Sequence, residues 1–295
     1  MSVLFISEVS SNHAQDLERS LEFIDVSADI GCDAVKFQLF KVRELFSPEA
    51  IAAKSDILDR EKWELPVDFL PELAKRCKRK NIQFSCTPFY LKAVEELEPY
   101  VDFYKIASYE MIWDDLITAC AETGKPLVMS TGMATMDEIY HAVKVFKHAG
   151  GRDLTLLHCT SAYPTPPEEA NLAAIHTLQS AFNCKVGWSD HTVTPGVIQR
   201  AIHKWGASAV EFHLDLEGDG AEYGAGHCWL PHQIQQVIAD SRVAETCDGD
   251  GEKKPVPSEL PDREWRADPS DGLRPLQSMR QKLVEHGWPL PDDGL

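Results

Sequence analysis

Short apolar runs rich in β-branched and aromatic residues alternate with segments of helical period from the first residues to about residue 246. The strand-like runs lie at 3–9, 34–38, 82–86, 103–107, 127–130, 154–158, 185–188 and 209–213. Strands that are separated by helices are joined by crossover connections, so they build a parallel sheet. Eight such units within roughly 240 residues fit a closed (β/α)8 barrel, the TIM barrel, better than an open doubly wound sheet. The sequence therefore predicts the α/β class and a TIM barrel with a short C-terminal extension.

The helical period is clearest in two of the intervening segments. Apolar residues fall on one face at positions 17, 21, 24 and 28, and again at 139, 143 and 146. Thr135 followed by Glu138 is typical of a capping box, and Gly150 closes the helix that this box opens. No G-x-G-x-x-G pattern follows the first strand, which argues against a dinucleotide-binding fold.

The composition changes after the last barrel helix. The segment 248–261 (DGDGEKKPVPSELP) is rich in Asp, Gly, Pro and charge, and it is typical of a linker. The remainder has one helical pattern at 276–286, too little to bury a core of its own. We therefore expect a barrel domain at 1–247, a linker at 248–261 and an appendage with a short helix at 262–295.

The charge and the cysteines bound the possible partners and the location. A formal net charge of −18 repels phosphate backbones and anionic membranes, so nucleic acid and membrane surfaces are not expected partners. The 8 cysteines are scattered without a C-x-x-C pair, which favours reduced, buried thiols. The first residues, MSVLFISE, have no basic region and meet an acid quickly, unlike a signal peptide. No apolar run approaches about 20 residues, so we expect a cytoplasmic protein.

Chemically reactive side chains follow almost every predicted strand at the point where it ends. In chain order they are Glu8; Lys36 and Gln38; Cys86 and Thr87; Lys105 and Ser108; Ser130 and Thr131; His158 and Thr160; Ser189, Asp190 and His191; Glu211 and His213. The active site of an α/β barrel lies at the carboxyl ends of its strands. We therefore expect these side chains to converge on one pocket.

Two lysines predict what this pocket binds. Lys36 and Lys105 each follow apolar residues in a predicted buried strand, where an unpaired ammonium is costly. Either each lysine pairs with a core carboxylate, or the two hold an anion inside an otherwise acidic protein. Hydroxyl groups at neighbouring strand ends would suit a phosphate and a carboxylate held side by side; they belong to Thr87, Ser108, Ser130, Thr131 and Ser189.

Two histidines are the candidate metal ligands. His191 and His213 end neighbouring strands, and two imidazoles there can bind a divalent metal that keeps positions open for water and substrate. For either histidine alone, an ordinary hydrogen-bonded role is the simpler interpretation. His158 is equally well a packed core histidine, and His13 is a weaker candidate. Tyr163 opens a proline-rich loop after the sixth strand and either closes over a ligand or packs the loop.

At these same residues the chain resembles the N-acetylneuraminate (sialic acid) synthase family. The matching segments are SEVSSNHAQDLERS, GCDAVKFQLF, FSCTPF, DFYKIASYE, GKPLVMSTGMAT, LLHCTSAYPTPPEEANL, VGWSDHT and AVEFHLD. They follow the family's order over roughly residues 3–240, the whole predicted barrel. Each segment alone is modest evidence, whereas the ordered set is highly specific.

The resemblance implies condensation of phosphoenolpyruvate with N-acetylmannosamine or a related amino-sugar aldehyde, giving a 2-keto-3-deoxy sugar acid and phosphate. It also implies a divalent metal, Mn²⁺ or Mg²⁺, and a homodimer. The family's catalytic and metal positions fall on Glu8, Lys36, Lys105, Glu110, His191 and His213, the last two being the metal ligands. Its substrate contacts fall on Gln38, Thr87, Ser108, Ser130, Ser161, Tyr163 and Ser189.

Three departures from the family pattern concern substrate recognition. Ser161 and Phe212 stand where the family usually has asparagine and arginine, and the loop DLEGDGAEYGAGHCWLP differs from the family's. The family's antifreeze-like C-terminal domain, which gives the sugar site an arginine from the dimer partner, is expected to be absent here. The candidate substitutes for this arginine in the appendage are Arg263, Arg266 and Arg274. The resemblance thus implies the reaction more firmly than the sugar, and a related nonulosonic acid or another aldose remains open.

Two other classes of function compete with a synthase. A metal-dependent barrel hydrolase usually has H-x-H at the end of the first strand, where this chain has Glu8-Val9-Ser10. A non-catalytic relative that binds a sugar or a phosphorylated metabolite is favoured by the expected absence of that domain and opposed by the intact lysine, serine and histidine set.

Overall fold

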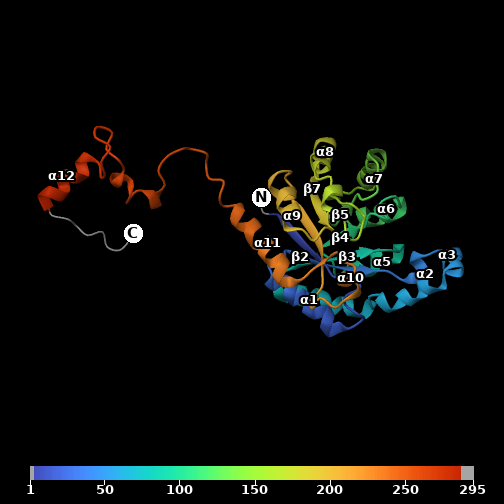
Figure 1. Ribbon diagram of the computed structural model, residues 1–295. Helices are drawn as coiled ribbons and strands as arrows, with labels where there is room; N and C mark the ends of the chain where they lie inside the picture. Colours follow the sequence, from blue (N-terminus) through green and yellow to red (C-terminus); the bar gives the residue numbers. More distant parts are fainter. Residues whose placement is uncertain (1–2, 287–295) are drawn as a thin grey trace. The chain divides into compact units, whose positions relative to one another are not determined.

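The computed structural model describes residues 3–286, and eight parallel strands in it close into a barrel (Figure 1). The strands are β1 (Leu4–Glu8), β2 (Ala34–Leu39), β3 (Gln83–Pro88), β4 (Phe103–Ile106), β5 (Leu127–Ser130), β6 (Leu154–His158), β7 (Lys185–Asp190) and β8 (Ala209–Leu214). Each pairs with the next along the chain, and β1 also pairs with β8. This closure confirms the TIM barrel and rules out an open sheet, which would leave β1 and β8 as edges.

One long helix follows each strand and lies on the outside of the barrel (Figure 1). These helices are α1 (Leu17–Asp29), α4 (Leu70–Lys80), α5 (Leu91–Leu97), α6 (Asp114–Glu122), α7 (Met136–His148), α8 (Ala173–Ala181), α9 (Pro195–His203) and α11 (Pro231–Ala244). The main hydrophobic core lies between this helical layer and the strands. In α7, for example, the predicted face buries Ile139, Val143 and Phe146, and Thr135 and Glu138 make the predicted capping box.

Two insertions interrupt the regular alternation. Between β2 and α4 lie α2 (Val42–Leu45), α3 (Pro48–Ala53) and the 3₁₀ helices η1 (Ser55–Trp63) and η2 (Val67–Phe69). The second insertion, between β8 and α11, contains α10 (Ala221–Gly224) and β9 (Cys228–Trp229); a single 3₁₀ turn, η3 (Pro167–Glu169), also follows β6. β9 adds to β8 as a short parallel strand, with Cys228 paired to His213. The second insertion therefore returns the chain to the end of β8.

The inside of the barrel is apolar at one end and polar at the other. Ile6, Ala34, Phe103, Val128, Leu157 and Ala209 form a small separate core inside it. Successive side chains of a strand point to opposite faces, so the residue two positions after an inward apolar residue also points inward. Glu8 thus follows Ile6, Lys105 follows Phe103 and Glu211 follows Ala209 toward the carboxyl ends of the strands.

Gly187 is needed where β7 packs most tightly. A Cβ atom at this position would lie 2.4 Å from the carbonyl oxygen of Ala209 and 2.7 Å from Leu157 Cδ2. Any larger side chain would therefore push β7 away from β8, the strand that carries Glu211 and His213.

Residues 246–295 form a second compact unit, separate from residues 1–245. It contains η4 (Pro257–Glu259), η5 (Arg263–Trp265) and α12 (Gln277–His286). The Asp268 carboxylate accepts a hydrogen bond from the backbone N–H of Gln277 at the start of α12, and Arg280 pairs with Asp271. The linker and appendage boundaries drawn from the sequence stay a prediction, and the predicted stretch 287–295 lies outside the described residues.

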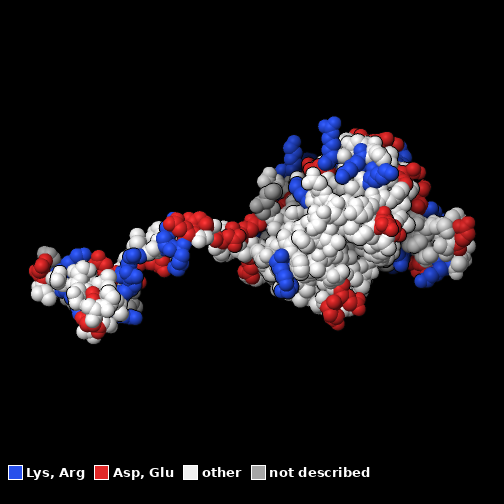
Figure 2. Space-filling view, turned by 90° about the horizontal axis from the view of Figure 1, so that it is seen from above, with Lys and Arg blue, Asp and Glu red and all other residues white. Residues whose placement is uncertain are grey.

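The described part of the chain has no helix that combines the length and the apolar composition needed to cross a bilayer. In Figure 2, the middle of the barrel face in view carries few charged side chains, and several lysine and arginine side chains gather near its upper edge with aspartate and glutamate side chains beside them.

Candidate active site at the carboxyl ends of the strands

A cavity of about 480 Å³ is formed by residues at the carboxyl ends of the strands. Among the residues predicted from the sequence, it is lined by Glu8, Lys36, Gln38, Thr87, Lys105, Ser108, Ser130, Tyr163, Ser189, His191 and His213. Glu110 and Ser161 are not among the lining residues. The convergence expected from the strand order is therefore present, and the role of each residue stays a prediction.

Glu8 and Lys36 form a buried pair on β1 and β2. One carboxylate oxygen of Glu8 accepts hydrogen bonds from the Ser10 backbone N–H at 2.7 Å and from Gln38 Nε2 at 3.1 Å. The other oxygen contacts Lys36 Nζ, which also donates to Thr87 Oγ1 at 3.4 Å. Both charged groups are almost inaccessible, so their mutual contact offsets the cost of removing them from water.

Glu211 lies between the two predicted anion-binding lysines. Its carboxylate is 3.7 Å from Lys36 Nζ and 3.3 Å from Lys105 Nζ, and it accepts a hydrogen bond from Ser189 Oγ at 3.2 Å. Burial would raise the pKa of Glu211, but the two ammonium groups outweigh it and hold the pKa below its usual range. The carboxylate thus keeps both lysines in the cavity wall. The structure confirms the first interpretation, since each lysine has a carboxylate partner; both lysines also line the cavity, and anion binding by them stays a prediction.

Hydroxyl groups surround Gly132 beside the lysines. Ser108 Oγ accepts a hydrogen bond from the Gly132 backbone N–H at 3.0 Å. A Cβ atom at Gly132 would lie 2.2 Å from Ser161 Oγ and 2.8 Å from Ser108 Oγ, so the side chains fit only around a glycine. The hydroxyls of Ser130 and Ser161 are buried without a hydrogen-bond partner among the described residues. A buried hydroxyl without a partner is costly, so these two groups can each take a hydrogen-bond partner from outside the chain, such as a water or a substrate oxygen.

Some strand-end residues face away from the cavity. The Asp190 carboxylate accepts hydrogen bonds from the indole N–H groups of Trp188 and Trp229, so it stabilises the packing around β7. His158 bonds to the Ala170 carbonyl at 3.0 Å and packs on Trp188, as a core histidine does.

Glu110, a predicted catalytic residue, has a raised pKa. Burial raises the pKa of its carboxyl group to about 7, and the nearby charge of Lys105 acts in the opposite direction.

The two predicted metal ligands lie side by side. The rings of His191 and His213 are 5.5 Å apart between centroids, and Tyr163 packs on His191 at 4.2 Å. His191 Nδ1 donates to the Thr160 carbonyl at 2.8 Å, which leaves Nε2 with its lone pair. Burial lowers the pKa of His191 to about 3, with the charge of His213 as the next cause, so its imidazole is neutral at pH 7. A neutral ring with one nitrogen fixed by a carbonyl suits metal ligation, so the pair fits a divalent cation.

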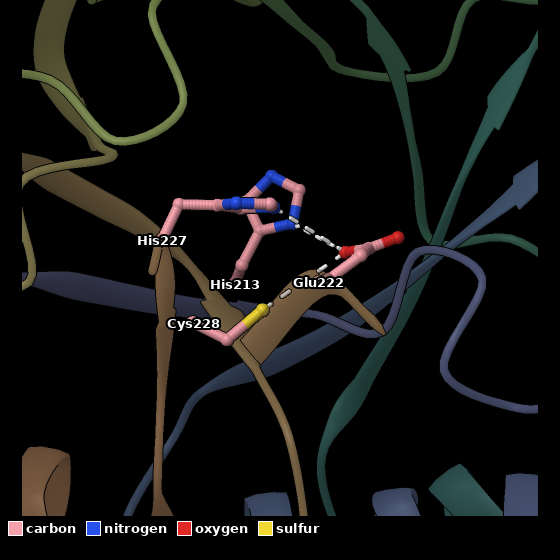
Figure 3. A group of neighbouring side chains, drawn as sticks. All are labelled: His213, Glu222, His227 and Cys228. Atoms are coloured by element: carbon pink, nitrogen blue, oxygen red, sulfur yellow. Dashed lines mark hydrogen bonds and ion pairs between the residues drawn. The ribbon is translucent and has the colours of Figure 1, made fainter. Parts of the chain in front are cut away.

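Several lining residues were not predicted as site residues. Glu211 was noted only as a strand end, whereas Arg60, Glu222 and His227 were not singled out at all. Arg60 belongs to the insertion after β2 and stacks on Phe46 and Trp63. Glu222 and His227 lie in the loop after β8, which the sequence marked only as unlike the resembled family's; Figure 3 shows them beside His213. Their spacing alone carried no strong signal, because a loop's conformation decides where its side chains point.

The arginines of the appendage belong to the second unit. Arg263, Arg266 and Arg274 all lie within 246–295, so a role for them at the cavity stays a prediction.

Known proteins resemble the chain over most of its length. The chain is 37% identical to an uncharacterized protein of Methanocaldococcus jannaschii, over 86% of this chain and 74% of that protein. It is 35% identical to the N,N'-diacetyllegionaminic acid synthase of Campylobacter jejuni, over 87% of this chain and 80% of the enzyme. Among solved structures, the N-acetylneuraminic acid synthetase of Leptospira borgpetersenii, in complex with citrate, matches with a TM-score of 0.79 and 30% identity, covering 90% of this chain and 92% of that one. The NeuB family model matches residues 23–253, the greater part of the barrel with every strand from β2 onward, and this chain therefore belongs to the NeuB family.

Proposed function

We propose that this protein condenses phosphoenolpyruvate with the open-chain aldehyde of N-acetylmannosamine or a related amino sugar. The products are a 2-keto-3-deoxy nonulosonic acid and phosphate. The observation that carries the proposal is the single cavity that is lined by Lys36 and Lys105 and by Ser130, whose hydroxyl has no hydrogen-bond partner among the described residues. The named relatives, a legionaminic acid synthase and an N-acetylneuraminic acid synthetase, support the same class of reaction.

The first task of the site is to hold a molecule with two anionic groups. A lysine ammonium has three donors, and Lys105 uses one of them on Glu211, which leaves capacity for a phosphate or a carboxylate. Two neutral hydroxyl donors lie at the same end of the barrel, those of Ser108 and Ser130. The Gly132 backbone N–H holds Ser108 Oγ in place. Because all of these groups are fixed by strands and ion pairs, they orient phosphoenolpyruvate before the second substrate arrives.

The chemical step joins C3 of phosphoenolpyruvate to the aldehyde carbon of the sugar, whose oxygen takes up a proton. Water adds to C2 and loses a proton, and the tetrahedral adduct then releases phosphate by cleavage of the C2–O bond. Glu8 lines the cavity and is held by Ser10, Gln38 and Lys36, so it is placed to orient this water or accept its proton. Glu110 is the alternative acid or base, and its raised pKa leaves it partly protonated near pH 7.

A divalent cation is part of the proposal, with His191 and His213 as the ligands assigned from the sequence. When bound, such a cation supplies Lewis acidity toward a carbonyl oxygen. Tyr163, packed on His191, and Gln38, bonded to Glu8, are the proposed sugar contacts. We further propose that the protein is a homodimer and is located in the cytoplasm. The mass of the purified particle, measured by light scattering, tests whether it is a dimer.

A phosphate-release assay tests the reaction. Purified protein is incubated with phosphoenolpyruvate, Mn²⁺ or Mg²⁺, and a panel that contains N-acetylmannosamine, its deoxy-diamino relatives and simple aldoses. We expect phosphate only when phosphoenolpyruvate and one class of acceptor are both present, with the keto acid identified by mass spectrometry. Phosphate release without an acceptor would support a hydrolase. Binding of phosphoenolpyruvate without turnover of any acceptor would support a non-catalytic relative.

A further inference from the structure

The insertion after β8 brings four potential metal ligands together. In the register of the sheet, Cys228 on β9 is the partner of His213 on β8, and His227 directly precedes Cys228. The short helix α10 carries Glu222 against them. His213, His227 and Cys228 are buried, with 8%, 6% and 2% of their surfaces exposed. The cluster therefore depends on the fold of one loop that returns to the strand from which it departed.

The geometry of the cluster is close to that of a tetrahedral metal site. Glu222 Oε2 lies 3.2 Å from His213 Nδ1, 3.6 Å from His227 Nε2 and 4.0 Å from Cys228 Sγ (Figure 3). All four ligand atoms lie within 4.8 Å of one another. Tetrahedral zinc with its usual bond lengths places neighbouring N, O and S ligands roughly 3.4–3.6 Å apart. Only small side-chain movements separate the observed distances from these values.

Three hydrogen bonds hold the Glu222 carboxylate in place on the side that faces away from the cluster. Glu222 Oε1 accepts hydrogen bonds from Ser10 Oγ at 2.6 Å, Ser11 Oγ at 2.6 Å and the Ser11 backbone N–H at 3.2 Å. These three donors fix the orientation of the group, so that Oε2 faces the two imidazoles and the thiol. Such outer contacts are what keep a ligating carboxylate in position.

We propose that His213, Glu222, His227 and Cys228 form a thiolate-containing site for a borderline divalent cation of the Zn²⁺ class. Two imidazoles, a carboxylate and a thiolate suit Zn²⁺, Co²⁺ or Fe²⁺, whereas Mg²⁺ and Mn²⁺ prefer oxygen ligands. Binding releases the Cys228 thiol proton to solvent and moves the His213 proton from Nδ1 to Nε2. Because His213, Glu222 and His227 also line the cavity, the cation lies in its wall.

This site differs from the pair of His191 and His213 in how it uses the shared histidine. A neutral imidazole has one lone pair, so His213 serves either the four-residue site through Nδ1 or the pair through Nε2. The inference concerns metal binding alone and does not rest on the proposed reaction. The four-residue site can therefore be absent from a protein that has synthase activity, and it can be present in a protein that has none.

Cobalt spectroscopy tests the inference without turnover. Co²⁺ is titrated into metal-free protein carrying Cys247→Ser, which removes the exposed thiol of the second unit. We expect one cobalt per chain, intense visible bands of tetrahedral cobalt and a near-ultraviolet thiolate-to-cobalt charge-transfer band. In the same background, Cys228→Ser should abolish the charge-transfer band. His227→Ala and Glu222→Gln should weaken binding by more than about tenfold, while His203→Ala, on the exposed side of α9, should change nothing.

The outcomes separate the two candidate sites. A cobalt-loaded protein without a thiolate band overturns the inference, whether or not any variant folds. Loss of cobalt binding in His191→Ala, with full binding retained in Cys228→Ser and His227→Ala, also overturns it and places the metal at the histidine pair. Loss of the thiolate-to-cobalt band when Zn²⁺ displaces the cobalt supports the four-residue site, and equal competition by Zn²⁺ and Mn²⁺ contradicts it.

Discussion

Replacing Lys105 by alanine removes one of the two ammonium groups from the proposed phosphoenolpyruvate site. In the structure, Lys36, Lys105, Glu8 and Glu211 form one network of ion pairs, and the substitution removes the positive charge of Lys105 from it. A unit charge at about 4 Å from an anion contributes about 4 kcal/mol at an effective dielectric constant near 20. Since about 1.4 kcal/mol corresponds to a factor of ten, the affinity for phosphoenolpyruvate should fall by roughly a thousandfold.

The fold should survive this substitution, because Glu211 keeps Lys36 and Ser189 as partners. Isothermal titration of metal-free protein with phosphoenolpyruvate measures the affinity, and circular dichroism checks the fold. The matched control is Lys92→Ala, which removes the same charge from an exposed ion pair with Glu95 on α5. If the dissociation constant of Lys105→Ala stays within about threefold of that of Lys92→Ala, the anion site has been assigned wrongly.

Three further predictions test other parts of the structure. Because the pKa of Glu110 is raised from 4.5 to about 7, the folded state keeps this proton where the unfolded state has lost it, so stability falls as the pH rises from 4.5 through 7. Glu110→Gln should remove roughly 3 kcal/mol of this pH dependence in urea unfolding; parallel curves for the two proteins would refute the raised pKa. Gly187→Ala should lower the free energy of unfolding by about 3 kcal/mol through overpacking against Ala209. Its control Gly196→Ala, with no heavy atom within 4 Å of the new Cβ, should cost nothing, and equal losses would contradict the tight packing of β7. Arg60→Ala should raise KM for the acceptor sugar by about tenfold or more without lowering kcat, since a charge-assisted hydrogen bond contributes about 1.5–3 kcal/mol; an unchanged KM would exclude Arg60 from acceptor binding.

The sequence was sufficient for the barrel and for the end of the barrel that carries the site. Alternation of strand and helix is a local property, and parallel strands joined by helices bring all their carboxyl ends to one side. The period of two along each strand then places Glu8, Lys36 and Lys105 on the inward face. For this reason most of the residues predicted from the strand ends line one cavity.

Only the tertiary structure decided the contacts that a loop or a packed neighbour controls. Asp190 and His158 end strands as their neighbours do, yet tryptophan N–H groups and a backbone carbonyl hold them away from the cavity. Glu222 reaches His213 because the chain folds back as β9 beside β8. Strand periodicity is fixed by backbone geometry and can be read from neighbouring residues, whereas the path of a loop depends on contacts between residues far apart in the chain, which no local pattern encodes.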